Sequence, residues 1–588
     1  MALKIKTNWD LKLLYKSDTD PQIEKDIKIF DKAVAGFEKK YKNSQDYLSK
    51  PDVLLNACQD YEKISFMPEL YKPQRYFSFK RDLDSKDKVA TARSNDIANK
   101  YSAMGNRLIF FRNSLGKVSK DVQENFLQSS SLSKYHYFLK NVFDNAQYEL
   151  SEAEEKILNL MRRPARTMWV SGFNKVLSNQ EIKFKGKILP ISEASSMIPQ
   201  LKTKERRELD KSIKEKVISI SDFAESELNA VFTNKKIRDE LRGYKKPYSS
   251  TVKQYENEDK TVENVISAVT ENFHIAHRFY KIKAKLLKEK RLKYCDRAAN
   301  VGESKTKFNF NDSVKIVRSA FAKFDKKYAD IFDSYLEKGQ IDVAPKKGKK
   351  AGAYCASTYG LPTFVLLNHV NDLNSLMTLG HEMGHSFHSE MSFENQPPVY
   401  SDYSTSVAEA ASTLFENFVF DEVFEKLSDK EKIVALHDKI NSSVSTIFRQ
   451  IACFNFELET HNSLREKGYL AKEEFADIMK QNMKSYLGPV FDMEDSDGYA
   501  FVSWPHIRNH FYVYSYAFGE IISSALYSNY KKDKNFIKNI EKFLSAGNSK
   551  KPEDIFKDAG LDIRKKDFFV QGLKKVEEDI KKLEKLVG

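Results

Sequence analysis

Apolar residues recur at intervals of three and four along most of the 588-residue chain. Segments 21–41 and 259–288 show this spacing clearly, with charged residues at the remaining positions. It is the period of amphipathic α-helices that bury one face. Because only 15 prolines and 21 glycines interrupt the pattern, the sequence predicts a predominantly α-helical globular protein.

Two segments depart from the helical pattern. Residues 180–188 alternate polar and apolar side chains around a Lys-Gly turn, and residues 362–370 form a Pro-led apolar run of strand length. We therefore expect a small β-sheet beside the helices. No repeat or long linker divides the chain, and the softest break lies at 188–196. We place an N-terminal helical domain at 1–195 and a second domain at 196–588.

The chain carries 97 basic and 83 acidic residues, a formal net charge of +14. Lysines alternate with Asp and Glu in most segments, as at 574–588. This alternation is typical of solvated helix faces rather than of a nucleic-acid-binding surface. The one compact basic run, at 345–350, surrounds a glycine and is typical of an exposed loop. We expect no nucleic-acid partner.

The four cysteines, Cys58, Cys295, Cys355 and Cys453, form no CxxC pair, which favours a thiol-reducing compartment. The N-terminal segment lacks an apolar core of signal-peptide length, and nowhere do about 18 apolar residues follow one another. We therefore expect a cytoplasmic protein with no membrane partner. The sequence gives no indication of the oligomeric state.

The strongest chemical signal lies at residues 371–391. His381 and His385 are four residues apart, so on a helix capped by Asn371 or Asp372 both imidazoles project from one face and can bind one metal ion. Glu382 lies beside that face, where its carboxylate is free to take a proton from water. This is the HExxH arrangement of zinc hydrolases.

Gly380 and Gly384 interrupt the same predicted helix. Glycine in a helix interior costs about 1 kcal/mol relative to alanine. A close approach of another backbone would explain both glycines.

Hydrolytic zinc takes three protein ligands and leaves one position for water. The spacing excludes a metzincin, because Met391 stands where that class places its third histidine. Glu409 lies downstream among alanines, where a carboxylate is unusual unless it is paired or ligating. We predict one Zn²⁺ per chain on His381, His385 and Glu409. Glu416, two turns farther on, either orients a ligating imidazole through its free N–H or is a surface charge.

These motifs resemble peptidase family M3, the thimet-type metallopeptidases, and within it the oligoendopeptidase F branch. The matching segments are HEMGHSFH at 381–388, VYSDYSTSVAEAAST at 399–413 and AGAYCASTYGLPTFVLLN at 351–368, with further matches at 8–15, 150–158 and 242–250. The resemblance implies a two-lobed, mostly helical metallopeptidase with a deep substrate channel, in which 196–588 is the catalytic domain. It also assigns Gly352, Ala353 and Tyr354 to a substrate-binding edge.

The segment SWPHIRNHFYVYSYAFGE at 503–520 resembles the family segment that supplies a histidine and tyrosines to the reaction. By its own pattern it predicts a helix starting at Pro505, with Tyr514 in the core and with Tyr512 and Tyr516 facing away from the apolar stripe. The resemblance favours His506 and Tyr516 as the groups that stabilise the oxyanion. Two residues are missing between the histidine and the tyrosine relative to the thimet-type pattern, so Tyr512 stays an alternative.

The sequence thus predicts a zinc endopeptidase that cuts short, unfolded oligopeptides, with Glu382 as general base and then general acid. Two other functions stay open. A helical zinc carboxypeptidase also uses HExxH with a downstream glutamate, and it would release single C-terminal residues. A helical metal- or peptide-binding protein would keep the site without the chemistry.

Overall fold

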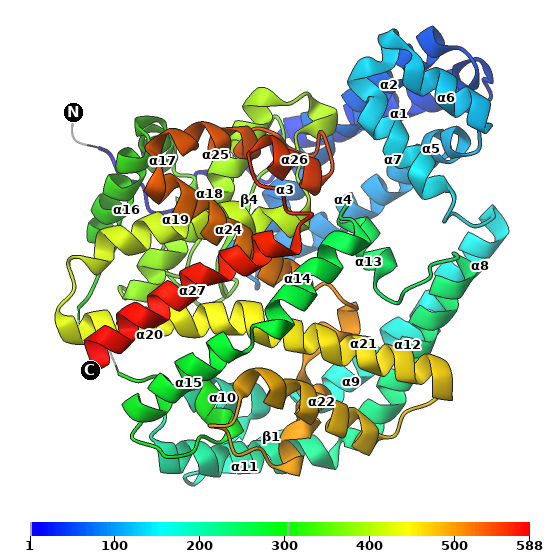
Figure 1. Ribbon diagram of the computed structural model, residues 1–588. Coiled ribbons are helices and arrows are strands. Elements are labelled where there is room, and N and C mark those ends of the chain that lie inside the picture. Colours follow the sequence, from blue (N-terminus) through cyan, green and yellow to red (C-terminus); the bar gives the residue numbers. More distant parts are fainter. Residues whose placement is uncertain (1–2, 303–305) are drawn as a thin grey trace.

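The computed structural model describes residues 3–302 and 306–588. Figure 1 shows helices arranged in two lobes that α8 (Glu152–Arg162) connects. The upper lobe contains the N-terminal helices and the C-terminal helices. Its N-terminal helices are α1 (Pro21–Tyr41), α2 (Pro51–Ser65), α3 (Pro68–Leu83), α4 (Lys88–Asn106), α5 (Ile109–Gly116), α6 (Lys120–Gln128) and α7 (His136–Ala146). The mostly α-helical prediction is confirmed.

The rest of the upper lobe surrounds a small sheet. Its helices are α16 (Phe310–Phe324), α17 (Lys326–Lys338), α18 (Leu373–Asn395), α19 (Thr405–Phe424), α24 (Tyr514–Lys532), α25 (Ile537–Leu544), α26 (Pro552–Asp558) and α27 (Lys566–Val587). Two further helices, α13 (Ser249–Gln254) and α14 (Asp259–Glu271), lie between the lobes, and α20 (Asp429–Val444) crosses below them (Figure 1).

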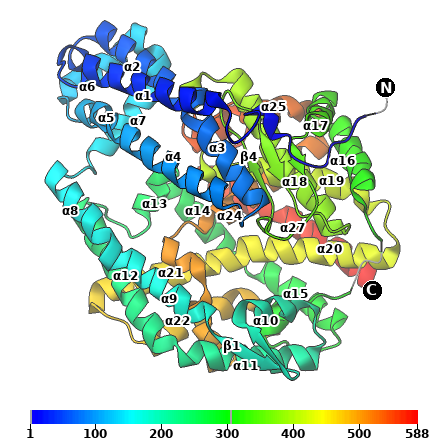
Figure 2. The ribbon, with the colours of Figure 1, turned by 180° about the vertical axis from the view of Figure 1, so that it is seen from behind.

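The lower lobe contains the middle of the chain, as the reverse view also shows (Figure 2). Its helices are α9 (Met168–Ser178), α10 (Ile191–Met197), α11 (Thr203–Ser219), α12 (Ser221–Leu241), α15 (His274–Leu286), α21 (Gln450–Lys467) and α22 (Lys472–Leu487). Segment 259–288, which has one continuous helical period, forms two helices, α14 and α15.

Both predicted β segments form strands. The Lys-Gly turn joins β1 (Glu181–Phe184) to the antiparallel β2 (Lys187–Pro190), and Lys185 and Gly186 both have positive φ, as a tight hairpin turn requires. The other segment contributes β5 (Phe364–Leu366), the central strand of a three-stranded sheet. Its neighbours are the parallel β3 (Ile341–Asp342) and the antiparallel β4 (Tyr354–Ala356). Since β4 pairs only with β5, β4 is an edge strand.

Local sequence explains where the two central helices begin. The Asp372 carboxylate caps α18 by accepting a 2.8 Å hydrogen bond from the N–H of Ser375, and the Ser404 side chain caps α19. The helix predicted to start at Pro505 is wrong. Residues 505–509 form only a short 3-10 turn, because His510 and Phe511 take φ values of 50° and 62°, which no α-helix can accommodate.

Among the residues that the structure describes, buried apolar side chains form one large core and two smaller ones. The large core runs from Phe173 to Leu583 and joins the lower lobe to the C-terminal helices, whereas a separate core lies within residues 30–143. Residue 195 lies inside α10. The division at 195 stays a prediction, and the grouping of the cores favours a boundary nearer α8.

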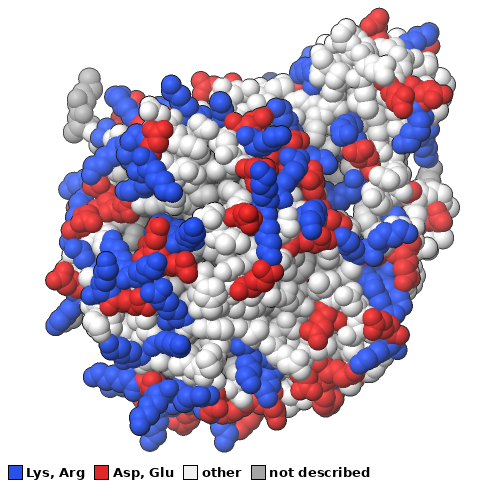
Figure 3. All heavy atoms as spheres, in the orientation of Figure 1, with Lys and Arg blue, Asp and Glu red and all other residues white. Residues whose placement is uncertain are grey.

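The surface charge agrees with the alternation of basic and acidic residues in the sequence. On the face in Figure 3, basic and acidic side chains are interspersed over most of the surface.

All four cysteines are free thiols. Within residues 3–302 and 306–588, no helix combines the length and the apolar character that a bilayer crossing needs.

Candidate active site

Helices α18 and α19 pack closely because α18 has glycines at the contact. A Cβ atom on Gly384 would lie 2.7 Å from the Cα of Ser412 and 3.0 Å from the carbonyl oxygen of Ala411. A Cβ on Gly380 would lie 2.8 Å from a methyl group of Val419. The close approach predicted from these glycines is confirmed, and it brings the side chains of both helices to one place.

Gly384→Ala is expected to lower the free energy of unfolding by about 1–3 kcal/mol, because the new methyl group meets backbone atoms that cannot move aside. Urea unfolding followed by circular dichroism measures this change. The matched control is Gly36→Ala in α1, where nothing lies within 4 Å of the new Cβ. There we expect stabilisation by up to about 1 kcal/mol. Equal effects at the two sites would contradict the close-packing account.

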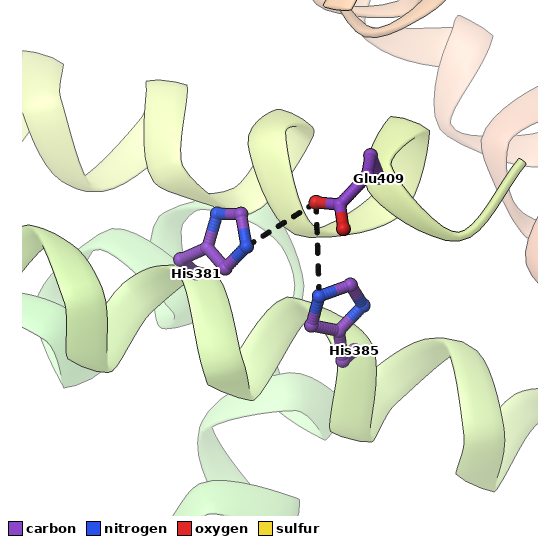
Figure 4. A group of neighbouring side chains, drawn as sticks. All are labelled: His381, His385 and Glu409. Carbon is purple, nitrogen blue, oxygen red and sulfur yellow. Dashed lines mark ion pairs between the residues drawn. The ribbon is translucent and has the colours of Figure 1, made fainter. Parts of the chain in front are cut away.

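The three predicted metal ligands converge where α18 meets α19 (Figure 4). The Nε2 atoms of His381 and His385 lie 3.3 Å and 3.8 Å from Oε2 of Glu409, and one donor atom from each residue lies within 4.8 Å of the others. Ligands at 2.0–2.1 Å from a tetrahedral zinc ion are about 3.3 Å apart. The donor types and the spacing of the group therefore fit zinc.

Glu416 lies on the other side of His381. Its Oε2 is 3.0 Å from Nδ1 of His381, so it accepts a hydrogen bond from that nitrogen when the proton is on Nδ1. This bond leaves the lone pair of Nε2 directed at Glu409 and the metal position. The nearby Glu520, in the YAFGE segment, accepts a 2.9 Å hydrogen bond from Ser443, and burial raises its pKa to about 7.

Burial changes the acidity of the groups at this site. It lowers the pKa of His385 to about 4, so the imidazole is neutral and its lone pair is free. Burial alone would raise the pKa of Glu409, but its contacts with His381, His385 and Ser412 hold it near 2. For Glu382, which is 6% exposed, burial outweighs the effect of His381 and raises the pKa to about 7.

The edge strand β4 lies beside the helix that carries Glu382. Cys355 in β4 places its thiol 3.3 Å from the hydroxyl of Ser386, and its backbone N–H donates to the carboxylate of Glu382. The side chain of Tyr354 points the other way and donates a 2.7 Å hydrogen bond to Asp82. Gly352, with φ of 79°, precedes the strand. The predicted substrate edge therefore includes an edge strand next to the candidate site.

His506, Tyr512 and Tyr516 form one cluster. The Tyr512 hydroxyl contacts Nδ1 of His506, and the three ring centroids are 5.5 to 5.9 Å apart. Tyr514 lies elsewhere: it is fully buried and donates a 2.9 Å hydrogen bond to Asn257, so its predicted core position is confirmed. Helix α24 packs against Glu409 at Gly519, where an added Cβ would lie 2.9 Å from the Cβ of Glu409.

A second group of possible metal ligands includes His510, two residues before Tyr512. Glu457 and His461 are four residues apart on α21, and with His510 they bring three donor atoms within 4.8 Å of one another. However, the guanidinium of Arg465, which can only donate, lies 3.3 Å from Nδ1 of His461, so the proton of this imidazole is on Nε2. That protonation disfavours a cation. Glu457 instead accepts a 2.7 Å hydrogen bond from the N–H of Phe511 and supports the bend before Tyr512.

Sequence reasoning missed this supporting role of Glu457. The only available signal was its spacing from His461, and nothing in the spacing shows that His510, 49 residues later, completes the group. The positive φ values of His510 and Phe511 depend on this long-range contact.

Comparisons with known proteins place the chain in a family. The model of peptidase family M3 matches residues 200–575. The chain belongs to peptidase family M3. A second model, described as Oligopeptidase F, matches residues 115–183. The predicted family and its oligoendopeptidase F branch are thus confirmed, as is the prediction that the chain is a peptidase.

Relatives in the M3 family match almost the whole chain. An oligoendopeptidase F homolog of Lactococcus lactis is 26% identical over 99% of this chain and 97% of its own length. The group B oligopeptidase PepB of Streptococcus agalactiae is 26% identical with the same coverage. The crystal structure of oligoendopeptidase F from Enterococcus faecium superposes with a TM-score of 0.70 at 18% identity, over 96% of this chain and 99% of that one. The M3 relationship makes the protein a metallo-oligopeptidase.

Proposed function

We propose that this M3 peptidase hydrolyses internal bonds of short, unfolded oligopeptides, with one zinc ion held by His381, His385 and Glu409. The observation that carries the proposal is the convergence of these three half-buried donor groups from α18 and α19 beside the buried Glu382. Zinc bound there would polarise the scissile carbonyl and lower the pKa of a coordinated water molecule.

The residues around the site supply binding and proton transfer. The backbone of Gly352, Ala353 and Tyr354 pairs with an extended peptide, as an open sheet edge does in other peptide-binding proteins. Glu382 takes the proton from the attacking water and gives it to the leaving amine. Its burial keeps bulk water away from the carboxylate, and the N–H of Cys355 orients it.

His506 and Tyr516 donate hydrogen bonds to the developing oxyanion, and Tyr512 positions His506. Burial, together with the charge of Arg449, lowers the pKa of His506, so its imidazole is neutral. The Tyr512 hydroxyl contacts Nδ1 of this imidazole, and in the proposed tautomer it donates to that nitrogen while the imidazole proton is on Nε2. Nε2–H is then the donor available to substrate. The proposal thus gives different roles to the two tyrosines that the sequence pattern leaves as alternatives.

The remaining features of the proposal concern the setting of the reaction. We propose a cytoplasmic enzyme in which residues 196–588 contain the whole catalytic apparatus and the N-terminal helices cover the substrate. Free thiols at all four cysteines agree with a reducing compartment. The substrates are oligopeptides, and neither nucleic acid nor a membrane takes part.

The test combines metal analysis with product analysis. We expect about one zinc per chain by mass spectrometry, and internal cleavage of a quenched fluorescent oligopeptide that a chelator abolishes and added zinc restores. A folded globular protein should stay intact under the same conditions. Release of single C-terminal residues would instead show a carboxypeptidase. Zinc without any cleavage would show a metal-binding protein, and either result would refute the proposal.

A further inference from the structure

A pocket of about 410 Å³ lies where α12 and α13 meet the segment that follows His506. Its walls include Arg166, Arg238 and Arg242, together with Asn509 and His510 from the segment 506–512. Figure 1 shows α12 and α13 on the side of the molecule where α8 joins the lobes. The pocket is therefore next to the His506–Tyr512 segment but separate from the predicted zinc ligands.

Most charges around the pocket neutralise one another. Arg242 forms two hydrogen bonds, of 2.7 and 2.8 Å, with the carboxylate of Glu155. Asp239 accepts hydrogen bonds of 2.6 and 2.8 Å from Lys235 and Arg465. These acids are thus engaged by the cations beside them.

Two arginines of the pocket, Arg166 and Arg238, form no ion pair within the described residues, and one further acid, Glu149, lines the same pocket. Among residues 3–302 and 306–588, the acceptors of Arg166 are both neutral: the carbonyl oxygen of Arg508 at 2.6 Å and the amide oxygen of Asn509 at 3.3 Å. Within the described part of the chain, the side chain of Arg238 has neither a hydrogen bond nor an ion pair. Burial lowers the pKa of both guanidiniums, and neighbouring arginines lower it further. Concentrated positive charge partly removed from water favours an anion.

The other walls suit the end or side chain of a peptide. Tyr148 and Tyr244 stack with ring centroids 4.4 Å apart and form a flat apolar surface, and Asn145 and Asn234 add amide groups. A guanidinium fork matches a carboxylate with two parallel hydrogen bonds. Arg166 also donates a hydrogen bond to the carbonyl oxygen of Arg508 in segment 506–512, so a ligand bound to Arg166 lies next to that segment.

We propose that Arg166 and Arg238 form a carboxylate-binding subsite for the peptide substrate. The inference rests on the proposed function, since it takes the ligand to be an oligopeptide. Its carboxylate is either the C-terminal group or the side chain of an Asp or Glu residue. In both cases the two guanidiniums bind the carboxylate, and the stacked tyrosines cover the neighbouring apolar atoms.

Binding to the Glu382→Gln variant tests the subsite without turnover. Calorimetry at low ionic strength compares three peptides of one sequence: the free acid, the C-terminal amide, and the amide with one Asp in place of Asn. We expect the peptide with the correct carboxylate to bind about tenfold more tightly than the neutral amide, as for a charge-assisted pair. Preference for the free acid or for the Asp peptide identifies which carboxylate is bound.

Adding Arg238→Gln should reduce that tenfold preference to less than about threefold. Arg318→Gln on α16 is the matched control, because it removes the same charge from an ion pair with Asp333 on α17 and should leave the preference unchanged. Equal binding of all three peptides, no binding of any, or a preference that survives Arg238→Gln would overturn the subsite. Failure of the parent protein to cut the same peptides would instead overturn the proposed function.

Discussion

Glu382→Gln is expected to lower kcat by a factor of about 10³ or more while the zinc content stays near one per chain. The amide keeps the size of the carboxylate but cannot accept the proton of the attacking water, and general acid–base catalysis contributes 10²- to 10⁴-fold. Glu382 is not among the three converging donors, so its replacement leaves the metal group intact. Peptide hydrolysis assays and metal analysis on the same sample measure both quantities.

The control for this variant lies on the same helix. Glu394→Gln near the end of α18 changes an exposed glutamate in the same way and should retain full activity. If Glu382→Gln kept the parental kcat, the assignment of the base would be wrong. If it lost zinc as well as activity, the carboxylate would be a ligand rather than a base.

Sequence patterns that span only a few residues correctly predicted individual helices and turns. Helix α1 begins and ends where the period of segment 21–41 does, and the Lys-Gly turn forms the predicted hairpin. In both cases the deciding physics is local: an Asp20 cap with Pro21 at the first turn, and a glycine free to take positive φ. In such cases the residues that determine the structure all lie within the segment or directly beside it.

The candidate metal group was predictable for a related reason. His381 and His385 are fixed relative to each other by helix geometry alone, and the small residues around Glu409 indicated a close helix contact. The bend at His510 and Phe511 was not predictable. It depends on two residues that are distant in sequence: Glu457 accepts a hydrogen bond from the N–H of Phe511, and Thr251 donates one to the carbonyl oxygen of His510. These contacts override a local pattern that favours a helix.

The arginine pocket also depends on contacts between residues that are distant in sequence, so the sequence alone does not predict it. Arg166 and Arg238 are 72 residues apart, on different elements, and their sequence surroundings resemble those of many solvated charges. Only the fold shows that two of the nearby acids, Glu155 and Asp239, are already paired with other cations. An uncompensated charge is a property of three-dimensional neighbours, so net charge along the chain cannot identify it.

Tyr516→Phe is expected to lower kcat by a factor of about 10² to 10³ with little change in KM, because it removes a hydrogen bond made to the oxyanion only in the transition state. Tyr512→Phe should cost less, about tenfold, since His506 keeps its donor but loses the contact that fixes its tautomer. Tyr514→Phe serves as the control: its hydroxyl bonds Asn257 in the core, so the loss should appear in the free energy of unfolding, by about 1 kcal/mol, and not in kcat. Steady-state kinetics and urea unfolding of the three variants separate these roles. A larger loss of kcat in Tyr512→Phe than in Tyr516→Phe would reverse the assignment and make Tyr512 the donor.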